Sequence, residues 1–371
     1  MGKFGKKNHI SLNPLDANIC LLGLPKIGKT SIMKEIAEEL VGEDGYLFLE
    51  MFRENGAKYI EDIVYEDVPD WATFVEIIDD IVDNKTSDYP DLKVVFIDTI
   101  DNALQLAEQE SIRVWNKENP TKRTQSINKT HGGFMKGQDF AMDLFQEQIF
   151  RLRQVGVAFS LIGHVKQTTV TDPITLETYQ QISSDVSQRY FNQLKKNIDL
   201  VGIAYIDREV VKERTGRKNI VNGKEEVINR VASEARKIKF RDPNYCVDSG
   251  GRMAEIVDEI DFDAHKFIEA MRDALEAAVK KSGKSVDARY KENTKADQAK
   301  AKQVAETEKA HKSQRELDIA IGEIVDFFTK NKTDLEIIKP ILAKCKEMGY
   351  SNPKEISDLD DAKTILAMTL K

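Results

Sequence analysis

Gly23-Leu24-Pro25-Lys26-Ile27-Gly28-Lys29-Thr30 is the most informative stretch of this chain of 371 residues. It fits the pattern G-x-x-x-x-G-K-[ST], whose glycine-containing loop holds phosphate groups. The apolar residues 19–22 before it are short enough for a buried strand, and apolar residues recur after it at helical spacing. The sequence therefore predicts a strand, a loop and a helix in that order, which is the arrangement that phosphate binding requires.

The predicted loop contains the groups that bind a nucleoside triphosphate. Its backbone N–H groups and the positive end of the following helix hold an anion. Lys29 is expected to reach the β- and γ-phosphates, and the Thr30 hydroxyl is expected to ligate Mg²⁺. We therefore expect ATP with Mg²⁺, in contact with Gly23, Leu24, Pro25, Lys26, Ile27, Gly28, Lys29, Thr30 and Ser31.

Composition and charge narrow the class of protein. A hydrophobic share of 41% supports a folded core, and no stretch is long and apolar enough for a membrane span. The net charge of −8 argues against indiscriminate adhesion to nucleic acid, so any such contact must come from a local patch. The three cysteines are far apart, as suits reduced thiols, and the five histidines lack zinc-ligand spacing. We expect a cytoplasmic protein without a zinc site.

The order of apolar segments predicts an α/β fold. From about residue 15 to 275, short apolar strands alternate with amphipathic segments, which indicates a mostly parallel sheet flanked by helices. Asn222-Gly223 is typical of a hairpin turn. Further strands are expected at 46–49, 94–97, 157–162 and 200–206, and helices at 71–82, 104–115 and 138–154.

The rest of the chain is expected to form a separate helical part. Residues 280–315 are rich in Lys, Ala, Glu, Asp and Gln, which is typical of a linker that is either disordered or a solvated helix. Apolar residues beyond it recur again at helical spacing. The expected division is a tail at 1–14, an ATPase core at 15–279, a charged linker at 280–315 and a small helical domain at 316–371.

Asp98 closes the apolar run 94–97 and has the form of a Walker B carboxylate, which completes the Mg²⁺ site. A parallel strand would deliver it to the sheet edge where the glycine loop lies. The alternative is a plain turn or a helix cap. Thr99 and Asp101 are expected to assist, although Asp101 is equally suited to cap the next helix.

Two further strand ends carry candidate catalytic groups. Glu50 ends the strand that follows the loop helix and is the candidate general base; Glu54 is its rival, and a plain surface glutamate is the alternative. His164 follows the strand at 157–162, where it can contact the nucleotide and sense its γ-phosphate, with Gln167 as a second candidate. A lone histidine at a strand end is also often structural.

Taken together, these segments resemble the RecA-type ATPase core. More narrowly, they resemble the compact phage-encoded RecA-like ATPases that bind and anneal single-stranded DNA. The resemblance covers about residues 15 to 275 and rests on the glycine loop, Glu50, residues 94–100 and residues 162–166. The loop departs from the usual pattern because Ile27 stands where a small residue is usual and because Pro25 lacks an N–H donor.

The resemblance implies that two loops line a DNA channel. Phe134, on the first loop, is expected to stack on bases together with a tryptophan, and lysines and arginines to neutralise phosphates. The alternative is a solvated flexible loop. The second loop, residues 168–190, is expected to be long, polar and mobile. The candidate DNA contacts of the first loop are Arg113, Trp115, Lys117, Lys122, Arg123, Lys129 and Lys136.

The resemblance also implies a homo-oligomer, a ring or a filament, in which a cation of one subunit completes the site of its neighbour. Lys239, Arg241 and Arg252 are the candidate trans-acting cations. The implied function is an ATPase, stimulated by single-stranded DNA, that promotes annealing and recombination in a bacterial host. The alternatives are a replicative helicase or helicase loader, or a nucleotide-gated adaptor whose C-terminal domain recruits a single-strand binding protein or a nuclease.

Overall fold

The computed structural model describes residues 10–171, 175–218, 225–242, 245–246, 248–331 and 335–369. The chain forms two compact units. The first consists of residues 1–78 and 91–300, and the second of residues 79–90 and 301–371.

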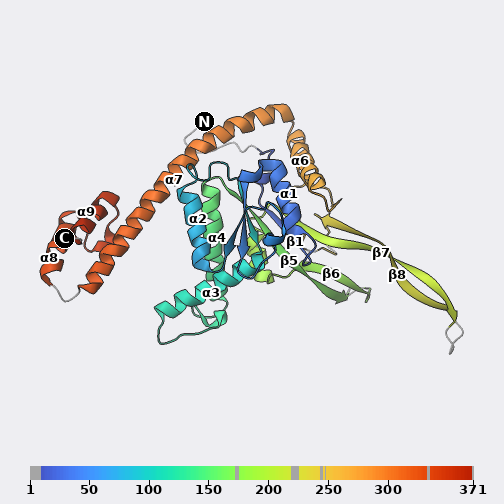
Figure 1. Ribbon diagram of the computed structural model, residues 1–371, viewed down its shortest axis with the longest axis horizontal. Helices are drawn as coiled ribbons and strands as arrows, with labels where there is room; N and C mark the ends of the chain where they lie inside the picture. The colour runs from blue at the N-terminus through green and yellow to red at the C-terminus, as the bar shows by residue number, and fades with distance from the viewer. Residues whose placement is uncertain are drawn as a thin grey trace. The chain divides into compact units, whose positions relative to one another are not determined.

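A mixed sheet, mostly parallel, forms the centre of the first unit (Figure 1). Neighbouring strands from β7 to β3 run parallel, and β8 and β10 extend the sheet in antiparallel fashion. The predicted α/β class with a mostly parallel sheet is therefore confirmed. The strands lie in the order β10 (Glu259–Asp261), β8 (Glu225–Lys239), β7 (Leu200–Lys218), β1 (Ile19–Gly23), β5 (Ala158–Thr171), β4 (Val94–Asp98), β2 (Tyr46–Met51) and β3 (Tyr65–Val68).

Helices cover both faces of this sheet (Figure 1). One face carries α1 (Lys29–Val41) and α6 (Ala264–Lys281). The other carries α2 (Trp71–Asp83), α3 (Ile100–Glu118) and α4 (Lys136–Gln154), and the short α5 (Gln188–Leu194) lies against α4. Because both faces are covered, β1 and β4 are buried along their whole length, which explains their uninterrupted apolar runs.

Aromatic packing shows how the two layers of helices hold the sheet. Phe48 of β2 stacks on Phe96 of β4 with ring centroids 4.4 Å apart, in the core that α1 and α6 close. On the other face, Phe74 of α2 stacks on Phe145 of α4 at 6.2 Å. The helical spacing predicted after the glycine loop is present, since α1 buries Ile32, Met33, Ile36 and Ala37.

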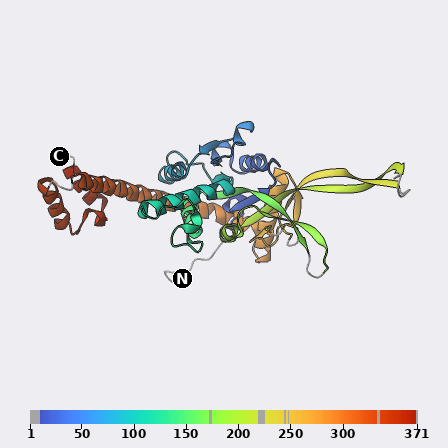
Figure 2. The ribbon, with the colours of Figure 1, turned by 90° about the horizontal axis from the view of Figure 1, so that it is seen from below.

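Two long hairpins extend past the sheet (Figure 1 and Figure 2). β5 continues beyond residue 162, where its predicted strand ends, and pairs with β6 (Thr178–Ser184). The prediction of a long loop at 168–190 is therefore wrong: the segment holds β-strand and α5, because a two-stranded ribbon exposed on both faces carries polar β-formers instead of an apolar run. β7 and β8 pair through Lys218 and Glu225, and the predicted turn at Asn222-Gly223 lies outside the described residues.

Other boundaries also differ from the sequence-based expectation. β3 was not expected, because it is an edge strand of largely exposed residues. Residues 1–9 of the expected tail lie outside the described part, whereas Leu12 and Pro14 are buried.

The shorter elements are β9 (Gly250–Gly251), which pairs with β7, and the 3₁₀ turns η1 (Pro14–Asp16), η2 (Glu43–Gly45), η3 (Ala57–Tyr59), η4 (Ile127–Lys129) and η5 (Pro353–Glu355).

The second unit is helical, with its own core. It contains the later part of α7 (Val286–Lys330), α8 (Leu335–Glu347) and α9 (Leu359–Thr369). The segment 280–315, expected as a linker that is either disordered or a solvated helix, is almost entirely helical, because Ala, Lys, Glu and Gln are strong helix formers. The boundary between the two compact units lies at residue 300, inside α7. Its core contains Leu317, Ile324, Ile341, Cys345 and Ile365.

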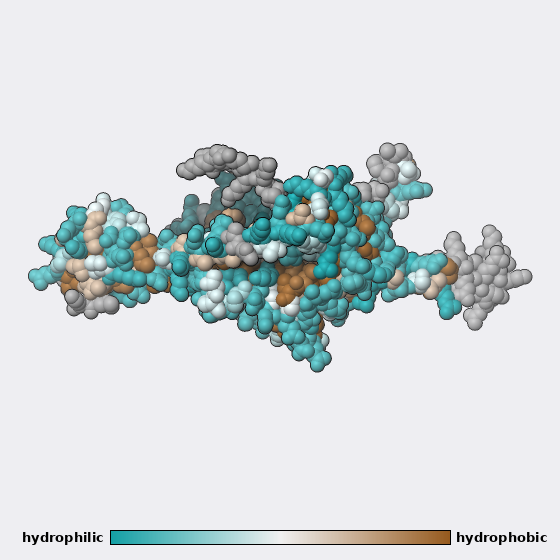
Figure 3. Space-filling view, turned by 90° about the horizontal axis from the view of Figure 1, so that it is seen from above, coloured by the Kyte–Doolittle hydropathy of each residue, from teal (hydrophilic) through white to brown (hydrophobic). Residues whose placement is uncertain are grey.

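The visible surface is mainly hydrophilic, with small separated apolar areas (Figure 3). This agrees with a charged-residue share of 32%. Among the helices that the structure describes, none combines the length and the apolar character of a membrane span.

Replacing Ile324 by alanine is expected to destabilise the second unit by about 2–4 kcal/mol, because this fully buried side chain leaves a cavity. Ile319→Ala on the same helix is the matched control: Ile319 is 54% exposed, so its loss should change stability by less than about 0.5 kcal/mol. Calorimetry of the full chain measures both. Equal effects of the two substitutions would contradict this core.

Candidate nucleotide-binding site

The glycine loop lies between the end of a central strand and the start of a helix, which is where a phosphate can bind. β1 is central, between β5 and β7, and ends at Gly23; α1 begins at Lys29. Gly28 precedes the helix with a φ of 105°, a conformation that favours glycine. The first N–H groups of α1 have no partner within the helix, so they are available to an anion.

The unusual Ile27 has a structural explanation. Its side chain is only 4% exposed and joins the core formed with α1 and α6. The neighbouring residues Pro25 and Lys26 are exposed. The isoleucine therefore anchors the middle of the loop to the core beneath it, whereas the two residues before it are exposed.

Lys29 is almost buried, with 7% of its surface exposed. Its Nζ donates to the carbonyl oxygens of Gly23 at 3.2 Å and Leu24 at 3.0 Å. Burial lowers the pKa of Lys29, and the negative charges of Asp98, Asp101 and Glu54 oppose that shift. The ammonium is thus held over the loop, where an incoming phosphate can replace the carbonyl partners.

Thr30 and Asp98 meet directly. The Thr30 hydroxyl donates to Oδ2 of Asp98 at 2.6 Å, although 68 residues separate them. Burial raises the pKa of Asp98 to about 6, while the hydrogen bond from Thr30 and the charge of Lys29 oppose the rise. The structure therefore brings together the two residues that were predicted from the sequence as metal ligands.

These oxygen donors fit Mg²⁺. A hydroxyl and a single carboxylate are the usual protein contribution to this ion, which takes its other ligands from phosphate and water. The Thr99 hydroxyl is buried beside them and has no hydrogen-bond partner in the described part of the chain. No cluster of three or more His, Cys, Asp or Glu side chains able to hold a metal occurs among the described residues.

Two glutamates lie next to this pair. Glu50 is opposite Asp98 on the neighbouring strand, is 5% exposed, and accepts a hydrogen bond from the Ala57 N–H at 2.7 Å. Glu54 contributes more than Glu50 to raising the pKa of Asp98 and also acts on Lys29. A Cβ at Gly56 would lie 3.9 Å from an Oε1 of each glutamate, so both carboxylates border the same space. Both stay candidates for the general base.

His164 lies beside Gly23 in the sheet and contacts α3. Its N–H donates to Oδ2 of Asp101 at 3.1 Å, and its Nδ1 is 3.2 Å from the same oxygen. Asp101 therefore holds the histidine and does not cap α3, whose N-cap position is Thr99. Gln167 is exposed within the β5–β6 hairpin.

Arg236 and Phe262 also border the loop, although neither was predicted from the sequence as part of the site. Nη1 of Arg236 donates to the Ile27 carbonyl at 3.0 Å, and its guanidinium lies 5.2 Å from the centre of the Phe262 ring. The only local signal was the basic stretch that begins at Arg236. Its contact with the loop depends on pairing between segments 209 residues apart.

The candidate trans-acting cations all have partners within their own chain. Lys239 lies 2.6 Å from Glu259, and Arg252 lies 2.7 Å from Asp199. Arg241 donates to the carbonyl of Met253 at 3.0 Å. A role in a neighbouring subunit stays a prediction and requires that these contacts be exchanged.

The first predicted DNA loop connects α3 to α4 and is well exposed. Phe134 is 95% exposed, and the surrounding lysines and Arg123 also face solvent. Two of the candidate DNA contacts already interact with other side chains. Arg113 pairs with Glu110 at 2.6 Å. Trp115 is half-buried, and its ring centre lies 5.5 Å from that of His131. The exposed candidates are Lys117, Lys122, Arg123, Lys129 and Lys136.

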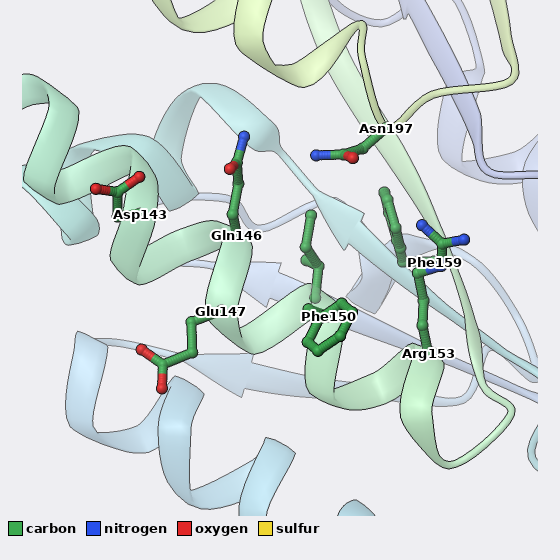
Figure 4. A pocket seen from close by; sticks show the side chains of 8 residues that line it. Asp143, Gln146, Glu147, Phe150, Arg153, Phe159 and Asn197 are labelled. Carbon is green, nitrogen blue, oxygen red and sulfur yellow. The ribbon is translucent and has the colours of Figure 1, made fainter.

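A surface groove of about 360 Å³ lies elsewhere (Figure 4). Phe150 and Arg153 of α4 line it, together with Phe159 near the start of β5 and Asn197. His164, at the glycine loop, is further along β5, so the groove belongs to the opposite edge of the sheet. No residue of the nucleotide site lines it.

Comparison with known proteins agrees with this geometry. The model of a protein family described as the AAA domain matches residues 15–236, more than half of the chain. This match includes the glycine loop, Asp98 and Arg236. No curated protein matches the sequence.

Asp98→Asn is expected to stabilise the nucleotide-free chain near neutral pH by about 1–3 kcal/mol. A carboxyl whose pKa rises from 3.8 to about 6 on folding binds more protons when folded, so its contribution to stability falls as pH rises between those values. The advantage of asparagine should shrink at about pH 5, where Asp98 is largely protonated. Thermal unfolding in metal-free buffer at both pH values measures it; an asparagine chain less stable at both would contradict the shift.

Proposed function

The chain belongs to the AAA domain family and is a nucleotide-binding P-loop ATPase, and we propose that it couples Mg²⁺-dependent ATP hydrolysis to the binding of single-stranded DNA. The observation that best supports Mg²⁺-dependent ATP hydrolysis is the Thr30–Asp98 hydrogen bond of 2.6 Å beside the buried Lys29. These residues place a hydroxyl, a carboxylate and an ammonium at one sheet edge, as phosphoryl transfer requires.

Each residue has a defined task in this proposal. The loop N–H groups and Lys29 bind the triphosphate and neutralise charge that develops on the transferred phosphoryl group. Thr30 and Asp98 hold Mg²⁺, which when bound adds further charge neutralisation at the phosphate oxygens. Glu50 or Glu54 orients the attacking water and accepts its proton.

The exposed loop between α3 and α4 supports the DNA-binding half. It combines a freely accessible aromatic ring, Phe134, with several exposed cations and little negative charge. Stacking and phosphate neutralisation together favour single strands without selecting a sequence. α3 also links this loop to the nucleotide site, because Asp101 in its first turn holds His164.

The resemblance to RecA-like annealing proteins supports the finer assignment. We propose that the protein works as a homo-oligomer that promotes annealing and recombination. The second unit, with its separate core, is proposed to recruit a single-strand binding protein or a nuclease.

Lys29→Ala is expected to reduce ATP turnover by roughly a hundredfold or more, because the phosphoryl group loses its main neutralising cation. Lys34→Ala on the same helix is the matched control, since Lys34 pairs with Glu38 at 2.7 Å and should leave turnover unchanged. Phosphate release with and without single-stranded DNA measures both. Undiminished turnover in the Lys29 variant would refute the site.

Removing Lys129, Phe134 and Lys136 together, each to alanine, is expected to weaken binding of a single-stranded oligonucleotide. The salt dependence should also flatten, by about 0.7 in log–log slope for each lysine that contacts a phosphate. Fluorescence anisotropy at several salt concentrations measures this, with Lys280→Ala on α6 as the control. The DNA-coupled function is wrong if DNA alters neither ATP turnover nor assembly state of the unmodified chain.

A further inference from the structure

Arg236 contacts the phosphate-binding loop from a strand that is distant in sequence. Its Nη1 donates to the Ile27 carbonyl oxygen at 3.0 Å. The Phe262 N–H donates to the Arg236 carbonyl at 3.0 Å, and the guanidinium lies over the Phe262 ring. Arg236 is thus held by β8 and by Phe262 while its tip reaches the loop.

We propose that Arg236 is a positioning residue that keeps the loop in its anion-binding conformation. This inference rests on the proposed ATPase function and adds to it a residue outside the glycine motif. It contacts the loop backbone, and no contact with the nucleotide is required of it.

Peptide geometry explains how one hydrogen bond can do this. The bond between Ile27 and Gly28 is planar and trans, so its C=O and its N–H point in opposite directions. Arg236 fixes the carbonyl on one side of the loop. The Gly28 N–H is consequently directed to the other side, among the donors at the start of α1 that are free to bind phosphate.

Arg236 and Phe262 pack against one side of the loop at Gly28. A Cβ added to Gly28 would lie 3.2 Å from Nη1 of Arg236 and 3.4 Å from the Phe262 ring. The two side chains therefore lie directly against the loop at Gly28. A glycine with a φ of 105° has little steric resistance to changing conformation, so contacts from outside are needed to hold it.

Charge distinguishes Arg236 from the basic residues next to it. Lys237 lies 3.0 Å from Asp207 and 2.8 Å from Glu259, and Lys239 lies 2.6 Å from Glu259. Arg236 forms none of the ion pairs found among the described residues. Its charge is therefore not neutralised by a direct partner, and it adds positive potential beside the phosphate site.

The test compares Arg236→Ala with Arg236→Gln, Arg236→Lys and the control Arg208→Ala. Arg208 belongs to the same hairpin but pairs with Glu234 at 2.8 Å. We expect Arg236→Ala to weaken equilibrium binding of Mg²⁺–ATP by roughly tenfold, raising KM more than it lowers kcat. Glutamine keeps a donor without the charge, and lysine keeps the charge without the fork, so each should recover part of the affinity.

The inference is overturned if Arg236→Ala binds Mg²⁺–ATP as the unmodified chain and the Arg208 control do. It is also overturned if the affinity loss merely follows a lowered unfolding temperature and neither glutamine nor lysine recovers it. These outcomes leave the proposed ATPase function intact as long as Lys29→Ala abolishes turnover. An unmodified chain that does not bind Mg²⁺–ATP would instead refute the function itself.

Discussion

The hydrogen bond between Thr30 and Asp98 is the contact on which the rest of the site depends, because it joins the phosphate loop to the carboxylate proposed to hold Mg²⁺. β1 and β4 are not neighbours; β5 lies between them. The contact therefore spans the end of an intervening strand. On that strand, a Cβ at Gly163 would lie 2.8 Å from Ile100 and 2.9 Å from Leu22, so glycine allows these two side chains to pack closely there. Parallel strands that end at one edge of the sheet are thus a requirement of this site.

Burying the charged groups of Lys29 and Asp98 has an electrostatic cost. Burial lowers the pKa of Lys29 and raises that of Asp98, and each of the two charges opposes the other's shift. The attraction between them offsets part of the desolvation, but not all of it, since the pKa of Asp98 still reaches about 6. Residues whose burial is costly and whose pKa values are displaced are typical of functional sites. The fully buried β1 and β4 provide the stability that tolerates this arrangement.

Much of this was predictable from local sequence, for identifiable reasons. The glycine loop, Asp98 and the central strands have strong local patterns, because the loop requires glycine at a fixed position and buried parallel strands require uninterrupted apolar residues. The β5–β6 hairpin was missed because an exposed ribbon has no apolar face to produce such a pattern. Arg236 was missed for a different reason: its role follows from a contact with Ile27 across 209 residues, and an arginine on a strand has no local feature that distinguishes it from a solvated one.

The partners of the basic residues after Arg236 also constrain any action between subunits. A cation can complete a neighbour's site only if it leaves its own partner, so the strength of that contact matters. Lys239, with a side chain 21% exposed, shares Glu259 with Lys237 and Tyr205, and together they hold the pKa of Glu259 at about 2 against the effect of burial. Arg252 has a side chain that is 64% exposed; it donates to the Lys196 carbonyl, and its pair with Asp199 is a surface pair, which is worth little. On energetic grounds Arg252 is therefore the easier of the two to release to a neighbouring subunit.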